Sequence, residues 1–239
     1  MYPRPFFAIL FLVDLIRKFK RRVRFALTAA QHSVNAAPKA ESLEQFLAKA
    51  GEMNAPRILE LGTKRSYAER STRHDEWVPN ASEFIGTDLE MDTDVDAAAD
   101  VHKLSSFFGE ESFDAIISCS SFEHFKYPQL AAHEIMRTLR IGGLLFIQTH
   151  HSYPLHAAPY DYYRFSTDAL AALFGTRMGF EVIKTDYQFP VRLFADQDKE
   201  LKFMPDYLNT QLFGIKRSAT PAEYTYELDA EVDTPVEPH

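Results

Sequence analysis

An almost uninterrupted apolar run at residues 113–121 (FDAIISCSS) constrains the fold of this chain most strongly. Strands that are buried on both faces read as continuous apolar runs, and they occur in parallel sheets that helices cover on both sides. Similar short segments recur at 57–61, 82–90 and 144–150. Helical patterns alternate with them, which predicts an α/β fold with a doubly wound, mostly parallel sheet and helices on both faces.

Helix stop signals mark the other elements. We expect helices that end at Gly51, at Gly142-Gly143 and at Gly175, and the last of these begins at Ser166, a good N-cap residue. The late strands 180–188 and 211–218 have no helix between them, so the last strand should be antiparallel. The intervening 188–210 is longer than most loops and predicts a lid or a small helical insertion.

Charge separates the ends of the chain from its middle. The first 27 residues are rich in Lys and Arg, with Asp14 as their only acid, whereas residues 218–239 carry acids and no Lys or Arg. We therefore expect a basic N-terminal helix and linker at 1–40, a core domain at 41–217 and a disordered acidic tail at 218–239. The net charge of -8 argues against a nucleic-acid partner. One cysteine, Cys119, fits a reducing, cytoplasmic location.

The basic helix has two interpretations. Its apolar part is shorter than a bilayer span, which needs about 20 residues, and Asp14 interrupts it. Residues 5–25 could instead lie in a membrane interface, beside anionic head groups at the inner membrane face. Alternatively, the helix packs its apolar side on the domain or on a second subunit, which would make the protein a homodimer.

The residues that follow each strand should form the ligand site, because α/β sheets bind ligands beyond the carboxyl ends of their strands. Glu60 and Gly62 follow the first strand, and Asp88, which ends the second, suits a ribose diol. A dinucleotide needs several glycines around its pyrophosphate, yet Lys64 and Arg65 occupy that turn. This favours a cofactor that has a ribose and an adenine but no phosphates.

Five stretches in this order resemble the class I S-adenosylmethionine-dependent methyltransferases: ILELGT, FIGTDLE, DVHKL, FDAIISCSSFEHF and LRIGGLLFIQT. The resemblance covers about 57–217 and implies a Rossmann-like sheet of seven strands with S-adenosyl-L-methionine as the cofactor. The segment HHSYPLHAAPYDYYRFSTDALAALF further resembles a bacterial subgroup that is linked to cell-surface polysaccharide pathways.

The resemblance also implies positions around the cofactor. Glu60 and Gly62 would lie beside its amino-acid portion and Asp88 at its ribose. Asp100, with the Val101 backbone, would contact the adenine, and Ser118 and Cys119 would lie where the fourth strand's end passes the cofactor. Glu123-His124 would either approach the transferred methyl group or cap the following helix.

The loop after the strand at 144–150 is the expected substrate loop. Methyl transfer to a hydroxyl needs a group that takes the proton, and a histidine suits this role, with His150 or His156 as the candidate. Tyrosine faces and hydroxyls would suit a sugar, and Arg164 would hold an anionic group or pair with Asp161. The candidate substrate residues are His151, Tyr160, Asp161, Tyr163 and Arg164. We expect no metal here, because nothing in the spacing of His150, His151, His156 and Asp161 places them on one face of a regular element.

We therefore expect a methyltransferase that acts on a hydroxyl of a glycan or a related small molecule. Two alternatives come from other classes. One is an NAD(P)-dependent oxidoreductase on a similar sheet, against which the missing glycines count. The other is a non-catalytic binding module that has kept the fold.

Overall fold

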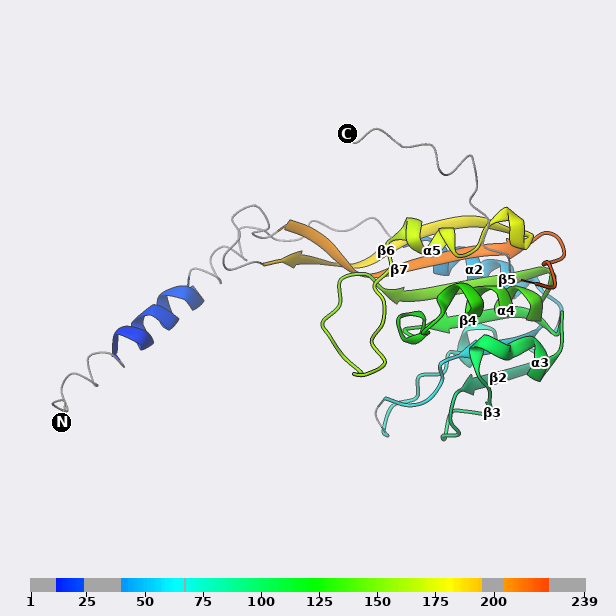
Figure 1. Ribbon diagram of the computed structural model, residues 1–239, viewed down its shortest axis with the longest axis horizontal. Coiled ribbons are helices and arrows are strands. Elements are labelled where there is room, and N and C mark those ends of the chain that lie inside the picture. The colour runs from blue at the N-terminus through cyan, green and yellow to red at the C-terminus, as the bar shows by residue number, and fades with distance from the viewer. Residues whose placement is uncertain (1–11, 24–39, 67, 195–203, 224–239) are drawn as a thin grey trace, which may run out of the picture. The chain divides into compact units, whose positions relative to one another are not determined.

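A computed structural model describes residues 12–23, 40–66, 68–194 and 204–223. The chain divides into two compact units, one of residues 39–188 and 208–239 and the other of residues 1–38 and 189–207. The larger unit holds most of the sheet and the helices that pack on it (Figure 1). Most of the expected acidic tail, 224–239, lies outside the described residues, as do 1–11 and 24–39.

The sheet has seven strands in the order β3-β2-β1-β4-β5-β7-β6. Strands β1, β2, β3, β4 and β5 pair in parallel, and β7 pairs with β5 in the antiparallel sense. This confirms the predicted Rossmann-like sheet in which the last strand of the chain is antiparallel. The strands are β1 (Arg57–Leu61), β2 (Glu83–Asp88), β3 (Ala97–Ala98), β4 (Phe113–Cys119), β5 (Leu139–His150), β6 (Phe180–Leu193) and β7 (Met204–Lys216).

Helices lie on both faces of the sheet (Figure 1). Helices α3 (Leu104–Phe108), α4 (Pro128–Thr138) and α5 (Thr167–Ala172) pack on one face, where Leu59 and Ile116 enter a shared apolar cluster. Helix α2 (Ser42–Glu52) packs on the other face through Phe46, against Ile58. Neighbouring residues of a strand thus enter opposite cores, which explains the continuous apolar runs of the sequence.

The crossover from β1 to β2 differs from an ordinary βαβ unit. The described residues between these strands contain only one short 3₁₀ helix, η1 (Asp75–Trp77), where an α-helix would usually cover the sheet. Trp77 and Val78 pack beside α2 in the same apolar cluster. This irregular segment therefore packs beside α2, where a crossover helix would usually cover the sheet.

The boundary between α4 and β5 corrects a prediction. The expected helix ran on to Gly142-Gly143, but α4 ends at Thr138 and β5 begins at Leu139. Leu139 pairs with Phe113, and the buried ammonium group of Lys216 donates to its carbonyl oxygen over 2.7 Å. These long-range contacts outweigh the helical pattern of the sequence.

The late strands are longer than predicted. Strand β6 continues to Leu193 and β7 already begins at Met204, so that the described parts of 188–210 are largely extended, while 195–203 lie outside the described residues. After β7, the first tail residues lie along the domain. The hydroxyl of Thr220 donates to the carbonyl oxygen of Met178, and the carbonyl oxygen of Pro221 bonds the ring of His133.

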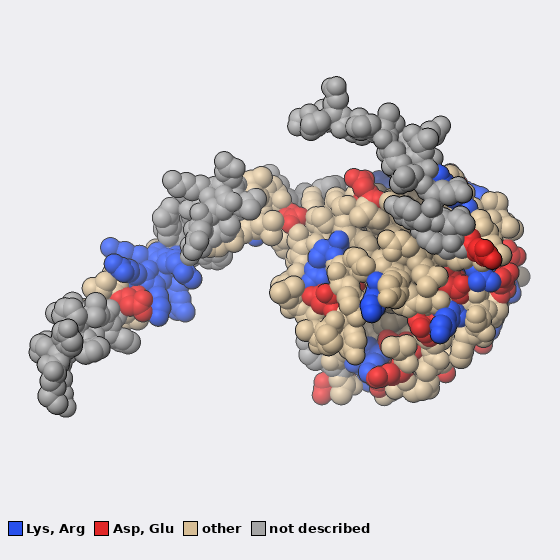
Figure 2. Space-filling model, in the orientation of Figure 1, with Lys and Arg blue, Asp and Glu red and all other residues tan. Residues whose placement is uncertain are grey.

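Residues 12–23 form a helix whose described side chains are all exposed. Figure 2 shows Lys and Arg side chains gathered over this helix. Its exposed apolar side chains recur at helical spacing: Leu12, Val13, Leu15, Ile16, Phe19 and Val23. Within the described parts of the chain, no helix has the length and apolarity needed to cross a membrane.

Candidate functional site

The carboxyl ends of β1, β2, β4 and β5 lie at one edge of the sheet, because these strands are parallel. Gly62 follows β1 with a φ of +80°, and its N–H donates to Thr87 at the end of β2 over 2.8 Å. A Cβ atom at Gly62 would lie 1.8 Å from Oγ of Ser121, which follows β4. The sequence therefore needs glycine here both for the turn and for the close approach of two strand ends.

Lys64 and Arg65, which take the place of the expected glycines, point toward acids of the segment after β2. Arg65 makes two bonds to the carboxylate of Asp94, of 2.7 and 2.8 Å, and Lys64 pairs with Glu90. The guanidinium of Arg65 holds the pKa of Asp94 down at about 2. Lys64 and Arg65 thus bind the loop after β1 to the segment after β2, whose acids neutralise their charges.

Glu60 is buried near the end of β1 and binds the segment between β1 and β2. One carboxylate oxygen accepts a hydrogen bond from the backbone N–H of His74 over 2.9 Å, and the other contacts Nδ1 of the His74 ring. In the structure, Glu60 therefore shapes the loop that follows β1. Its expected place beside the cofactor's amino-acid portion stays a prediction.

Asp88 and Asp100, the acids expected at the ribose and the adenine, both lie at this edge. Asp88 ends β2 and accepts backbone N–H bonds from Lys64 and Leu89 over 3.1 and 2.7 Å. Asp100 precedes the half-buried Val101 and accepts from the backbone and the ring of His102. Burial by itself would raise the pKa of Asp100, but the bonds from His102 outweigh it and leave that pKa lowered.

Ser118 and Cys119 close β4 between two buried acids. The hydroxyl of Ser118 is fully buried and has no hydrogen-bond partner among the described residues. Burial, helped by the charges of Glu60 and Glu123, raises the pKa of the Cys119 thiol well above its ordinary value. Cys119 is therefore a neutral thiol, and a reactive thiolate is not expected there.

This edge fits a cofactor with a ribose but no phosphates. Asp88 and Asp100 keep acceptor capacity beyond the bonds described, since a carboxylate offers about four lone-pair positions. The segment from 88 to 100 is rich in aspartate, so a pyrophosphate would meet like charge, whereas a sulfonium cation would not. S-adenosylmethionine has the ribose, the adenine and the positive charge that these residues suit.

Beside this edge, three histidines surround one buried carboxylate. Glu123, in the 3₁₀ helix η3 (Phe122–His124), is 0% exposed. Its Oε1 lies 3.0 Å from Nε2 of His150, 3.8 Å from Nε2 of His124 and 3.9 Å from Nε2 of His156. The structure thus brings the two predicted catalytic histidines, His150 and His156, together around an acid.

The other ring nitrogen of each histidine contacts an oxygen atom. Nδ1 of His124 lies 2.8 Å from the carbonyl oxygen of Tyr160, and Nδ1 of His156 lies 3.1 Å from that of Pro154. Nδ1 of His150 lies 2.9 Å from Oδ1 of Asn209, its partner across β5 and β7. Burial lowers the pKa of His150 against the opposing pull of Glu123.

Asp161 and Arg164 fix the shape of the loop after β5. Arg164 binds both carboxylate oxygens of Asp161 and donates to the carbonyl oxygens of Tyr153, Pro154 and Tyr163. Asp161 also accepts from the backbone N–H of His156 over 3.0 Å. Hydrogen bonds from Arg164 hold the pKa of Asp161 far below its ordinary value. Of the two roles expected for Arg164, the structure has the pairing with Asp161.

The remaining predicted substrate residues spread over this loop. Tyr160 is 62% exposed, and the hydroxyl of Tyr163 donates to the carbonyl oxygen of Lys126 over 3.2 Å. His151 directly follows His150 at the end of β5. Its ring contacts that of Tyr187, and its Nδ1 is hydrogen-bonded to the carbonyl oxygen of Phe165. Tyr160 therefore presents its ring to solvent, and His151 serves to close the base of the loop.

Several residues of the cluster escape sequence analysis. Asn209 lies in no motif. Thr149 ends the stretch LRIGGLLFIQT, but its role depends on its partner, because its hydroxyl donates to Oε2 of Glu123 over 2.7 Å. Glu123 and His124 stand in a recognisable stretch, but only the fold shows that Glu123 is the centre of the cluster. The backbone oxygen of Glu123 also accepts hydrogen bonds from the backbone N–H groups of Tyr162 and Tyr163, so Glu123 binds the loop after β5 as well.

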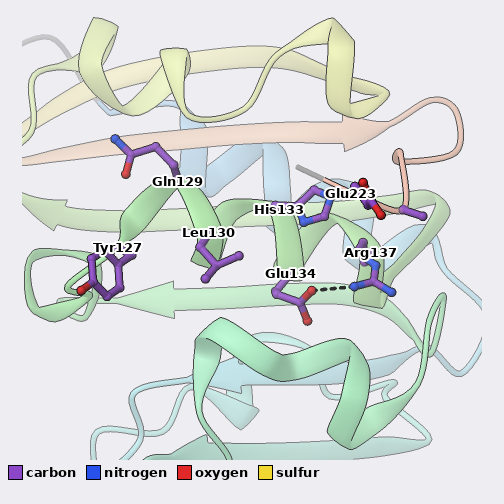
Figure 3. A pocket seen from close by; sticks show the side chains of 8 residues that line it. Tyr127, Gln129, Leu130, His133, Glu134, Arg137 and Glu223 are labelled. Carbon is purple, nitrogen blue, oxygen red and sulfur yellow. Dashed lines mark hydrogen bonds and ion pairs between the residues drawn. The ribbon is translucent and has the colours of Figure 1, made fainter. Parts of the chain in front are cut away.

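A shallow pocket of about 610 Å³ lies elsewhere, on the outer side of α4. Figure 3 shows its lining side chains, with Leu130 and His133 on the helix and Glu223 from the segment after β7. Arg137 pairs with Glu134 at one end. None of the predicted site residues lines this pocket.

Comparison with known proteins gives a family match and a fold. Residues 74–147 match the family model described as a methyltransferase domain. No curated protein matches the chain. The match covers β2, β4 and most of β5, and with them the Glu123 region.

Solved structures share the fold at low sequence identity. A putative methyltransferase from Bacillus halodurans has a TM-score of 0.54 at 14% identity, covering 75% of this chain and 100% of that one. A methyltransferase dependent on S-adenosylmethionine from Archaeoglobus fulgidus has a TM-score of 0.52 at 14% identity, covering 73% and 95%.

A third structure carries ligands. It is the 1,6-didemethyltoxoflavin-N1-methyltransferase of Burkholderia thailandensis with bound 1,6-didemethyltoxoflavin and S-adenosylhomocysteine. It has a TM-score of 0.50 at 14% identity and covers 91% of this chain and 92% of its own. The family match is therefore to a methyltransferase domain over part of the chain, and the solved structures share its fold.

Proposed function

We propose that this S-adenosylmethionine-dependent methyltransferase transfers its methyl group to a hydroxyl of a glycan or a related small molecule. The observation that carries the proposal is the cluster of Glu123, His150 and His156, which lies at the same sheet edge as the cofactor acids. A hydroxyl is a poor nucleophile until its proton is removed, and this cluster offers buried groups that can receive it.

The cofactor would lie across the ends of β1, β2 and β4. Asp88 would accept the ribose hydroxyls, and Asp100 with the backbone of Val101 would hold the adenine. Glu60 and Gly62 would border the amino-acid portion, while Ser118 and Cys119 would pass beneath it. S-adenosylmethionine supplies the electrophilic methyl group; the residues of the chain bind it, orient it and exclude water.

His150 and His156 are the proposed catalytic residues. Their Nδ1 atoms face oxygen acceptors, so their Nε2 atoms can carry lone pairs toward Glu123. A hydroxyl placed beside Nε2 can pass its proton to either ring. In-line transfer then needs that oxygen about 3 Å from the methyl group, a position that the loop after β5 would enforce.

The acceptor would lie against this loop. Tyr160 and Tyr163 offer aromatic faces of the kind that stack on sugar rings, and His151 borders them. Arg164 and Asp161 would support the substrate mainly by shaping the loop, because their charges already pair. The subgroup resemblance of this loop favours an acceptor from a cell-surface polysaccharide pathway.

We further propose that the segment of residues 5–25 rests on the inner face of a membrane, as a peripheral contact of an otherwise cytoplasmic protein. Its described part, 12–23, exposes apolar side chains at helical spacing together with a Lys/Arg cluster, the composition of an interfacial helix (Figure 2). The alternative is that this face joins two copies in a homodimer. Flotation with anionic liposomes separates the two ideas, since a variant without residues 1–27 should lose liposome binding only in the first case.

The domain arrangement proposed with this function has a catalytic domain at 41–217, with a lid within 188–210. The basic segment 1–40 precedes it, and the acidic tail 218–239 follows. Limited proteolysis with and without S-adenosylhomocysteine tests the lid, because closure over the cofactor should protect sites within 188–210.

The deciding test of the reaction is a screen of hydroxyl acceptors with S-adenosylmethionine carrying a labelled methyl group. Label should enter a glycan or a lipid-linked saccharide, and the variant His156→Ala should bind cofactor normally but transfer little label. Label found only on nitrogen or sulfur acceptors would contradict the proposal. A chain that binds cofactor and transfers nothing to any acceptor would favour the non-catalytic module.

A further inference from the structure

The carboxylate of Glu123 poses a problem in electrostatics. It is 0% exposed, and its Oε1 accepts no hydrogen bond within the described part of the chain. Nε2 of His150, at 3.0 Å, pairs with this oxygen only if the ring is protonated. A buried charge without a partner costs several kcal/mol in general, so such groups are almost always paired or bound to metal. The other oxygen, Oε2, is already satisfied by the hydroxyl of Thr149. The unsatisfied atom points into the histidine cluster.

The histidines cannot all donate to this oxygen in their neutral form. A backbone carbonyl only accepts, so the bond between Nδ1 of His156 and Pro154 places the ring proton on Nδ1. The side-chain oxygen of Asn209 also only accepts, so its bond with Nδ1 of His150 places the ring proton of His150 on Nδ1. Both neutral rings therefore turn an Nε2 lone pair toward Glu123. Two ring nitrogens with free lone pairs and one carboxylate oxygen then lie within 4.8 Å of one another.

From this arrangement we propose that Glu123, His150 and His156 bind a divalent transition-metal ion, with Zn²⁺ as the expected occupant. Tetrahedral zinc sites have Zn–N and Zn–O bonds of about 2.0–2.1 Å, which places neighbouring ligand atoms about 3.3 Å apart. The Nε2 atoms of His150 and His156 lie 3.0 and 3.9 Å from Oε1 of Glu123, on either side of that value. All three ligand atoms lie within 4.8 Å of one another.

The partners of the three ligands strengthen this assignment. Ligand histidines usually donate their second ring N–H to an oxygen, and ligand carboxylates are hydrogen-bonded in turn, which fixes their orientation. Here Asn209 and Pro154 hold the two rings, and Thr149 holds the carboxylate. Two imidazoles and one carboxylate suit zinc, iron or cobalt, whereas Mg²⁺ and Ca²⁺ prefer oxygen ligands.

Three protein ligands leave one position open, as in catalytic rather than structural zinc sites. His124 stands beside the cluster, with Nε2 at 3.8 Å from Oε1 of Glu123. Resting on the proposed function, the open position would take the acceptor hydroxyl. With an ion bound, His150 and His156 would serve as ligands and not as proton acceptors. The ion would favour the deprotonated form of that hydroxyl, and the proton would pass to Nε2 of His124, whose Nδ1 faces the carbonyl oxygen of Tyr160. Linear spacing could not reveal the site, because its ligands come from η3, the end of β5 and a loop.

The test measures metal rather than activity. The full chain is stripped with a chelator, reloaded with Zn²⁺, freed of excess ion, and analysed for zinc per chain by mass spectrometry. We expect one zinc per chain in the wild type. Glu123→Gln and His156→Ala should each weaken zinc affinity at least tenfold in competition with a chromogenic chelator. His133→Ala, which removes a histidine of α4 outside the cluster, should bind as the wild type does.

A second probe reports the ligands directly. With Co²⁺ in place of Zn²⁺, a site of low coordination number gives visible absorption bands, and these should be lost in His156→Ala, whose ring lies in a loop and can be removed without opening the core. Wild-type chain that retains no ion would overturn the proposal, as would undiminished binding in both cluster variants. Calorimetric binding of S-adenosylhomocysteine to the metal-free chain tests the cofactor site separately, so failure of one conclusion does not imply failure of the other.

Discussion

The pair of Arg65 and Asp94 explains how a glycine-poor loop keeps its shape, and replacing Asp94 with Asn tests this. The carboxylate of Asp94 is nearly buried, and its pKa in the folded protein is about 2. An unperturbed aspartate has a pKa of about 3.9, and each unit of difference corresponds to about 1.4 kcal/mol, which bounds the contribution at about 2.5 kcal/mol. Because the side chain of Arg65 is 23% exposed, solvent screening reduces the expectation to about 1–2 kcal/mol.

The pH dependence follows from the direction of this shift. The folded pKa of Asp94 is depressed, so its stabilisation is present above the unfolded pKa, near 4, and is lost as the pH falls toward 2. Urea unfolding at several pH values should therefore show Asp94→Asn less stable than the wild type at pH 7. The difference between the two proteins should shrink steadily between pH 4 and pH 2.

A matched control comes from the same loop. Glu90→Gln breaks the pair between Glu90 and Lys64, whose side chains are 70% and 44% exposed, and it should leave the unfolding free energy nearly unchanged. If Asp94→Asn were as stable as the wild type at pH 7, or if the difference did not depend on pH, the Arg65–Asp94 pair would not be what fixes the loop.

Two further predictions concern the cofactor edge. Gly62→Ala should destabilise the chain by about 2 kcal/mol or more in urea unfolding, since the new Cβ would meet Ser121 at 1.8 Å on a positive φ; Gly51→Ala, where nothing lies within 4 Å, should be neutral or stabilising. An unchanged unfolding midpoint in Gly62→Ala would mean that the strand ends do not approach so closely. Asp88→Ala should weaken S-adenosylhomocysteine binding about ten- to hundredfold in calorimetry, because each hydrogen bond to a charged group contributes about 1.5–3 kcal/mol. The exposed Asp75→Ala is the control, and equal affinity in both variants would place the ribose elsewhere.

Sequence patterns predict the sheet well because its strands carry their own signal. The apolar run of β4 and the shorter run of β1 follow from burial on both faces, which any parallel sheet imposes. The end of α4 is different: Leu139 and Arg140 continue the helical pattern of the sequence, but the pairing of Leu139 with Phe113 and its bond to Lys216 place them in β5. Local periodicity cannot report contacts between residues so far apart in the chain.

The candidate site divides in the same way. The places of Asp88, Asp100, His150 and His156 are predictable, since these residues end or follow strands or lie in a distinctive loop; their roles stay predictions. The lack of an α-helix among the described residues between β1 and β2 is less so, because it depends on distant contacts: Trp77 packs in the apolar cluster of α2, and Arg65 binds Asp94. Asn209 is not predictable at all, as its role depends on its register with His150 across β5 and β7.

The central claim is that this sheet edge binds S-adenosylmethionine. Calorimetric titration of the purified chain with S-adenosylmethionine, S-adenosylhomocysteine and NAD measures it most directly. We predict that the first two bind at one per chain, and that NAD, whose pyrophosphate would meet the acids around Asp88, gives no measurable heat. Preference for NAD, or no binding of S-adenosylmethionine or S-adenosylhomocysteine, would contradict the claim.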